Sequence, residues 1–87
     1  TIILKKKYLP HMLSLWKAPF QTPLLVEGFT DMEQEVQSVL VQLGIEPGEQ
    51  IEKIHSAPLG DPIAIKIGEH LFTLRSEICQ KIQVKTL

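Results

Sequence analysis

The sequence is poor in cysteine and in aromatic residues, and it has no long apolar run. Its single cysteine, Cys79, excludes a disulfide within the chain, whereas secreted domains of this size usually carry several. The lysine-rich start is not followed by the small-residue cleavage site of a secretory leader. No apolar stretch approaches the roughly 20 residues that a membrane-spanning helix needs. We therefore expect a cytoplasmic protein whose 87 residues fold around one core without disulfides.

Charge is distributed unevenly along the chain. Residues 1–23 contain four lysines and no acidic side chain, whereas residues 24–87 contain ten acidic and five basic ones. An acidic body repels phosphate backbones, so we expect no nucleic acid as a partner. The change in composition predicts a basic, apolar N-terminal extension over residues 1–22 and a folded domain over residues 23–87.

The extension contains an apolar segment between Pro10 and Pro19. Its spacing predicts two turns of helix whose common face carries Met12, Leu15 and Trp16. We expect the extension to pack on the domain or on a second copy, which would make a homo-oligomer. The alternative is a segment that docks on a membrane surface or a transporter, because Trp and Lys suit such an interface.

The domain begins with a predicted strand over residues 24–29, followed by a helix. Gly44 is expected to end this helix, because glycine adopts the left-handed conformation cheaply. Thr30 or Asp31 is the expected N-cap. The apolar stripe of the helix consists of Met32, Val36, Val39, Leu40 and Leu43.

The second half of the domain is predicted to form strands joined by tight turns. Pro47-Gly48 predicts a type II turn, and the imperfect alternation over residues 50–57 predicts a bulged strand. Gly68-Glu69 predicts a two-residue hairpin loop. That loop places Ile67 opposite His70, Ile65 opposite Phe72 and Ile63 opposite Leu74. With a last strand over residues 81–85, the pattern predicts a mainly β, small α+β fold: a closed barrel of five strands with one helix after the first.

Two motifs in this chain resemble those of the ferrous iron transport protein A (FeoA) family. Leu43-Gly44-Ile45-Glu46-Pro47-Gly48 is similar to the family's Leu-Gly-Ile-x-Pro-Gly, and Ala57-Pro58-Leu59-Gly60-Asp61-Pro62-Ile63 to its Ala-Pro-x-Gly-Asp-Pro-Ile. Phe72-Thr73-Leu74-Arg75 and Ile82-Gln83-Val84 resemble later strands of the family. The likeness covers residues 24–86. One departure is apolar Val39-Leu40-Val41, where the family often has a basic residue.

The resemblance implies an SH3-like barrel in a small bacterial accessory protein of ferrous iron uptake. Such a protein would dock on the cytosolic, GTP-binding part of the membrane transporter and modulate it by protein contact. It would lie at the inner membrane through that partner alone, and it would not be an enzyme. An iron- or transition-metal-responsive regulatory domain is the alternative, because the same barrel occurs at the C-terminus of iron-dependent repressors. The third hypothesis is a structural role, in which the chain associates with itself through residues 1–23.

Turn formation explains most of the motif residues. Gly60 permits a positive φ, Asp61 can bond a backbone N–H two residues on, and Pro62 can open a strand. Nothing around Asp61 in the sequence supplies a nucleophile or a base, so we expect no catalytic residue. The residues expected to build the two motif turns are Leu43, Gly44, Ile45, Pro47, Gly48, Pro58, Gly60, Asp61 and Pro62.

Three positions are candidates for partner contact. Leu59 and Leu71 would form an apolar patch if the barrel leaves them exposed side by side. Arg75 would pair with Glu77 or Asp61, or contact the partner.

The candidate metal ligands are scattered. His55, His70 and Cys79 show none of the paired spacings that hold metal ions, so we expect no cofactor beyond weak Fe²⁺ or Zn²⁺ binding.

Overall fold

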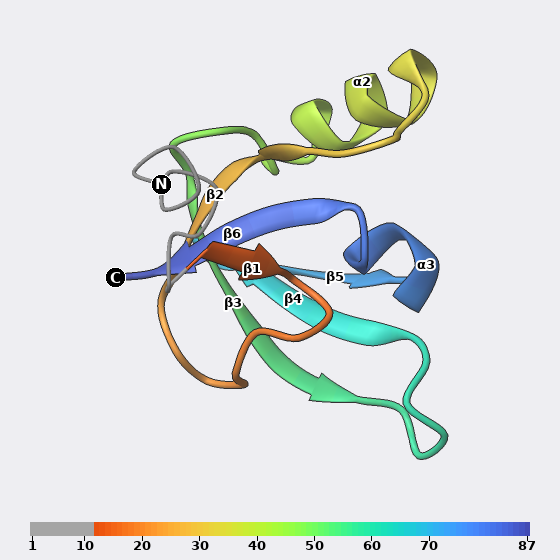
Figure 1. Ribbon diagram of the computed structural model, residues 1–87. Coiled ribbons are helices and arrows are strands. Elements are labelled where there is room, and N and C mark those ends of the chain that lie inside the picture. Colours follow the sequence, from red (N-terminus) through yellow and green to blue (C-terminus); the bar gives the residue numbers. More distant parts are fainter. Residues whose placement is uncertain (1–11) are drawn as a thin grey trace, which may run out of the picture.

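The computed structural model describes residues 12–87 as one antiparallel β-sheet with two helices (Figure 1). The strands lie side by side in the order β1-β6-β2-β3-β4-β5, and all neighbours are antiparallel. The predicted mainly β fold with a helix after residues 24–29 is confirmed, with one strand more than expected. The elements are β1 (Met12–Ser14), β2 (Leu24–Phe29), α2 (Gln34–Gln42), β3 (Gln50–Ser56), β4 (Ile63–Ile67), β5 (His70–Leu74), α3 (Ser76–Cys79) and β6 (Ile82–Thr86).

The hairpin of β4 and β5 has the predicted register. Ile67 lies opposite His70, Ile65 opposite Phe72 and Ile63 opposite Leu74. The isoleucines of β4 are buried in the core, and Leu74 joins them. The turn chemistry and the apolar alternation therefore specify the same pairing.

The bulge predicted for the third strand is also present. The register between β3 and β4 shifts between Lys53 and His55, which bends β3. Before this strand, Gly48 has a φ of 95°, and the N–H of Glu49 donates to the carbonyl oxygen of Glu46, as a type II turn requires.

Helix α2 ends as predicted but begins differently. Gly44 has a φ of 99°, and the N–H groups of Gly44 and Ile45 donate to the carbonyls of Val41 and Leu40, which is a Schellman cap. The predicted cap by Thr30 or Asp31 is wrong, because the N-cap position is Glu33 and no side chain caps there. Val39, expected on the buried stripe, is 54% exposed.

Residues 12–22 of the predicted extension pack on the domain, which is one of the two arrangements expected from the sequence. Met12–Ser14 forms a strand paired with β6, so the helix predicted between Pro10 and Pro19 is wrong. Leu15 and Ala18 are buried in the same core as the barrel strands. The physical reason is strand pairing: β6 pairs with β2 along one edge, and β1 pairs with its other edge. Residues 1–11 of the predicted extension lie outside the described residues.

Apolar side chains from every strand pack into one core. The side chains buried most completely are Leu15, Leu24, Val26, Ile45, Ile51, Ile63, Ile65, Cys79, Ile82 and Val84. Helix α3 contributes Cys79, while its neighbour Ile78 packs against the core from a partly buried position. Among residues 12–87, no helix is long and apolar enough to cross a membrane.

Candidate functional site

A buried lysine holds the loop between β1 and β2 against the barrel. Lys53 on β3 is 2% exposed. Its Nζ donates hydrogen bonds to the carbonyl oxygens of Trp16 (2.9 Å) and Ala18 (2.8 Å). The same Nζ lies 4.3 Å from the centroid of the Phe20 ring, a cation–π contact. Because a buried charge is costly unless it is paired or hydrogen-bonded, these contacts explain how the lysine is tolerated.

We call residues 15–21 the anchored loop. Besides the lysine side chain, the backbone of Lys53 accepts a hydrogen bond of 2.6 Å from the N–H of Gln21. At the other end of the loop, the N–H of Leu15 donates to the carbonyl of Ile82. The loop is therefore fixed on the sheet at both ends and in the middle.

Lys53 and Cys79 lie in one buried region and perturb each other. Burial lowers the pKa of Lys53, and the nearby Cys79 acts in the opposite direction. Burial raises the pKa of the Cys79 thiol to about 11, while Lys53 opposes this shift and Asp61 adds to it. Cys79 is thus a neutral, buried thiol and not a reactive one.

The anchored loop and the second motif border one pocket. This pocket encloses about 290 Å³. Two aromatic side chains at its edge are exposed, Trp16 by 37% and Phe20 by 43%. Gly60 of the motif also lines the pocket, and its neighbour Leu59 is 97% exposed. The remaining lining residues are Lys17, Lys53, Ser56 and Ile63.

The second motif shapes a turn and also fixes helix α3. Gly60 has a φ of 91°, and its N–H donates to the carbonyl of Ala57. The sequence predicted that Asp61 bonds a backbone N–H two residues further on, but its partner in the structure is Ser76. Its carboxylate accepts hydrogen bonds from the N–H and the Oγ of Ser76, at 2.8 and 3.2 Å. Ser76 is the first residue of α3, so this carboxylate holds the start of the helix.

The three candidate contact residues do not form one patch. Leu71 is 66% exposed and lies opposite Lys66, near the end of β4. Leu59 precedes the first residue of β4, so the two leucines lie at opposite ends of that strand. Arg75 is exposed, and among residues 12–87 the one ion pair joins Lys85 to Glu27, so the predicted pair of Arg75 with Glu77 or Asp61 is wrong.

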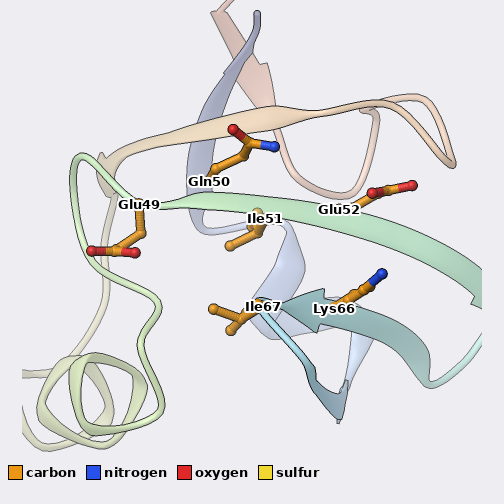
Figure 2. A pocket seen from close by; sticks show the side chains of 7 residues that line it. Glu49, Gln50, Ile51, Glu52, Lys66 and Ile67 are labelled. Carbon is orange, nitrogen blue, oxygen red and sulfur yellow. The ribbon is translucent and has the colours of Figure 1, made fainter.

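A second, larger pocket lies beside β3 and the end of β4. It encloses about 450 Å³ and is lined by Glu49, Gln50, Ile51, Glu52, Lys66, Ile67 and Gly68. Figure 2 shows the side chains of Ile51 and Ile67 close together, while Gln50, Glu52 and Lys66 point away from them. Of its polar groups, Glu52 and Lys66 are cross-strand partners that point to the same side, whereas Glu49 and Gln50 point elsewhere, so the four do not converge on one point.

The weak metal candidates are not brought together. His55 and His70 are exposed on different strands, whereas Cys79 is buried. Among residues 12–87, no group of three His, Cys, Asp or Glu side chains is arranged to hold a metal ion.

Comparison with protein families now identifies the barrel. A family model described as the FeoA domain matches residues 15–86. The chain belongs to the FeoA domain family. The match begins at Leu15, the first buried residue of the anchored loop, so the FeoA domain extends further towards the N-terminus than the motifs alone indicated. The comparison with curated proteins finds no match.

Solved structures agree with this assignment. Iron(II) transport protein A of Clostridium thermocellum is 35% identical, with a TM-score of 0.78 over 86% of this chain, and this chain spans 46% of that protein. The FeoA of Stenotrophomonas maltophilia, a prokaryotic SH3 domain protein complexed with zinc, is 25% identical, with a TM-score of 0.71 over 84% of this chain and 89% of its own. The predicted SH3-like fold is confirmed.

One further likeness shows the fold alone. A manganese-dependent transcriptional repressor is 19% identical, with a TM-score of 0.78 over 92% of this chain and 44% of its own.

The sequence did not point to Lys53 or Phe20 as site residues, and it pointed to Trp16 only through the alternative of a docking segment. A signal was present for Lys53, because it lies two positions after Ile51 and a strand places alternate residues on the same face. A lysine at a core-facing position of a strand indicates a buried partner. The identity of that partner, two backbone carbonyls in a distant loop, has no signature in the sequence.

Proposed function

We propose that this chain is an accessory protein of ferrous iron uptake that binds the cytosolic, GTP-binding part of the membrane transporter. It modulates the transporter by contact and catalyses no reaction itself. The protein would lie in the cytoplasm, at the inner membrane only through its partner. Membership in the FeoA family and the name of the C. thermocellum relative support the link to ferrous iron transport.

The observation that carries the binding role is the apolar surface beside the anchored loop. We call Trp16, Lys17, Phe20, Leu59 and Gly60 the docking surface. Leu59 exposes 97% of its surface on a turn held rigidly by its own hydrogen bond, so the exposure is built into the fold. Aromatic side chains beside a pocket are typical anchors of protein interfaces.

The docking surface also has the right charge for an acidic partner segment. Lys17 is exposed beside the two aromatic residues, and Lys53 lies beneath Phe20. Because Lys53 fixes the loop before any partner arrives, little conformational entropy is lost on binding.

The experiment is a titration of the purified full chain with the purified cytosolic part of the transporter from the same genome. Leu59→Ser should weaken binding by about tenfold or more, the range of an interface hot spot, without lowering the melting temperature. Trp16→Ala should act in the same direction. Leu71→Ser is the matched control: an exposed leucine at the other end of β4, expected to leave this affinity unchanged. Unchanged binding by Leu59→Ser and Trp16→Ala would overturn the proposal.

A metal-responsive role is the second candidate, favoured by the zinc complex of the S. maltophilia relative. In this chain the weak ligands His55, His70 and Cys79 lie apart, so we expect weak, non-stoichiometric binding of Fe²⁺ or Zn²⁺. Anaerobic equilibrium dialysis measures this directly. Tight binding of one metal ion per chain, lost on substitution of one of these residues, would favour the regulatory role.

A further inference from the structure

Strand β5 forms an outer edge of the sheet. It pairs with β4, and within residues 12–87 no other strand pairs with it. In a hairpin with a two-residue loop, the residues that flank the loop exchange hydrogen bonds, and every second pair after them does the same. His70, Phe72 and Leu74 therefore bond to β4. The backbone N–H and C=O groups of Leu71 and Thr73 point away from β4, towards the open edge.

This edge lacks the features that usually prevent strand pairing. Natural edge strands carry lysines, prolines or bulges, or are very short. None of the five residues of His70–Leu74 is an acidic residue, a lysine, an arginine or a proline, and the β4–β5 register is regular throughout. Leu71 adds an apolar side chain that is 66% exposed. The other edge strand, β1, has three residues and offers a shorter template.

The residues that flank β5 have opposite charges. Glu69 lies directly before the strand and Arg75 directly after it, and both are exposed. A strand of this kind is complementary to itself when two copies run antiparallel, because each end then meets the opposite charge.

We propose that β5 pairs with β5 of a second copy, antiparallel, about a two-fold axis at Phe72. In this register Leu71 of one copy lies opposite Thr73 of the other, and both carry outward-facing backbone groups. The two Leu71–Thr73 pairs exchange about four backbone hydrogen bonds. Glu69 of each copy lies opposite Arg75 of the other. Hydrogen-bond parity excludes any axis that lies between two residues, and the pairing of Glu69 with Arg75 favours Phe72 among the axes that remain.

Shifted registers are poorer. An axis at Thr73 would place residue 77 opposite residue 69, but the chain leaves the extended conformation at Ser76, where α3 begins. An axis at Leu71 would leave Arg75 without a counterpart on the strand, because residue 67 of the second copy belongs to β4.

The inference is independent of the proposed docking function. The docking surface borders the start of β4 at Leu59 and Gly60, whereas Leu71 lies opposite Lys66 near its end. Leu59→Ser should change transporter binding and leave self-association unaltered, so the two proposals can fail separately. An interface of one short strand belongs to the weak, transient class.

The test is sedimentation velocity of the full chain over a wide concentration range. The wild type should form a dimer as concentration rises. Thr73→Pro removes an N–H that faces the edge and does not serve β4, so it should weaken the dimer by about tenfold or more. Thr73→Val keeps the N–H and should dimerise like the wild type. Melting curves show whether Thr73→Pro is folded; if it is not, the charge variants below decide.

Charge exchange tests the register itself. Arg75→Glu places two glutamates opposite each other at both ends and should weaken the dimer, by up to about tenfold for two like-charge pairs. Combining it with Glu69→Arg restores both ion pairs and should restore the dimer. A wild type that stays monomeric at all concentrations overturns the proposal. So does a dimer whose affinity is unchanged by the charge variants, or one that Arg75→Glu weakens and the double variant fails to restore.

Discussion

The β4–β5 hairpin and the anchored loop are held in place by different kinds of contact. The hairpin consists of residues 63–74, which pair with close neighbours in the sequence across a two-residue turn. The anchored loop, residues 15–21, depends on Lys53, whose hydrogen bonds reach back 35 and 37 residues. The hairpin supplies core packing, whereas the loop carries exposed aromatic side chains. One residue can therefore control the loop, while the hairpin is stabilised by many residues at once.

The sharpest test of the hairpin is Ile65→Ala. Ile65 is fully buried at the centre of β4. Removing three carbon atoms there leaves a cavity between the strands, and we expect a loss of about 3–4 kcal/mol in the free energy of unfolding. Urea denaturation followed by Trp16 fluorescence measures the loss.

The control for this prediction is Thr73→Ala on the exposed face of β5. At concentrations where the chain is monomeric, it should change stability by less than about 0.5 kcal/mol. If both variants lose the same amount, the hairpin is not the centre of the core.

The corresponding test of the anchored loop is Lys53→Met. Methionine fills much of the same space but donates no hydrogen bond, so the carbonyls of Trp16 and Ala18 lose their donor. An unpaired buried carbonyl costs about 1–3 kcal/mol, and since the Trp16 carbonyl is only partly buried we expect about 2–3 kcal/mol in total.

The site of this loss distinguishes the two regions. Amide hydrogen exchange should rise most at Ala18 and Gln21, and much less at Ile65. Lys66→Met, at an exposed position of β4, is the matched control and should change neither stability nor exchange. Equal increases in the loop and the hairpin would show that Lys53 acts on the whole fold and not on the loop.

The same contrast explains what the sequence could predict. The hairpin register, the Schellman cap at Gly44 and the bulge in β3 depend on residues within a few positions of one another, so turn chemistry and alternation were sufficient. Strand β1 was missed because it pairs with β6, about 70 residues later, and three residues carry no detectable alternation.

For the site, the sequence named Leu59 and Leu71 as candidate contact residues, but it did not predict that they lie apart. Local pattern gives the face on which a side chain lies, whereas the distance between two loops depends on the whole sheet. Asp61 shows the same limit: its turn was predicted, but its hydrogen bonds to Ser76, 15 residues away, were not.

The smallest expected effect concerns Cys79, which lies in the buried region next to Lys53. Its pKa is raised to about 11 from 9.0, mainly by burial. Well below pH 9 the thiol is protonated in both states. Between pH 9 and about 11 the unfolded chain loses this proton while the folded chain keeps it, so stability falls as pH rises. The lowered pKa of Lys53 acts in the opposite direction and reduces the slope of stability against pH.

The difference between the wild type and Cys79→Ala, measured by urea denaturation at each pH, isolates the thiol: the wild type should lose more stability across this window. Parallel profiles would mean that the thiol is as accessible to water as in the unfolded chain, and that the anchored loop does not seal the region around Lys53.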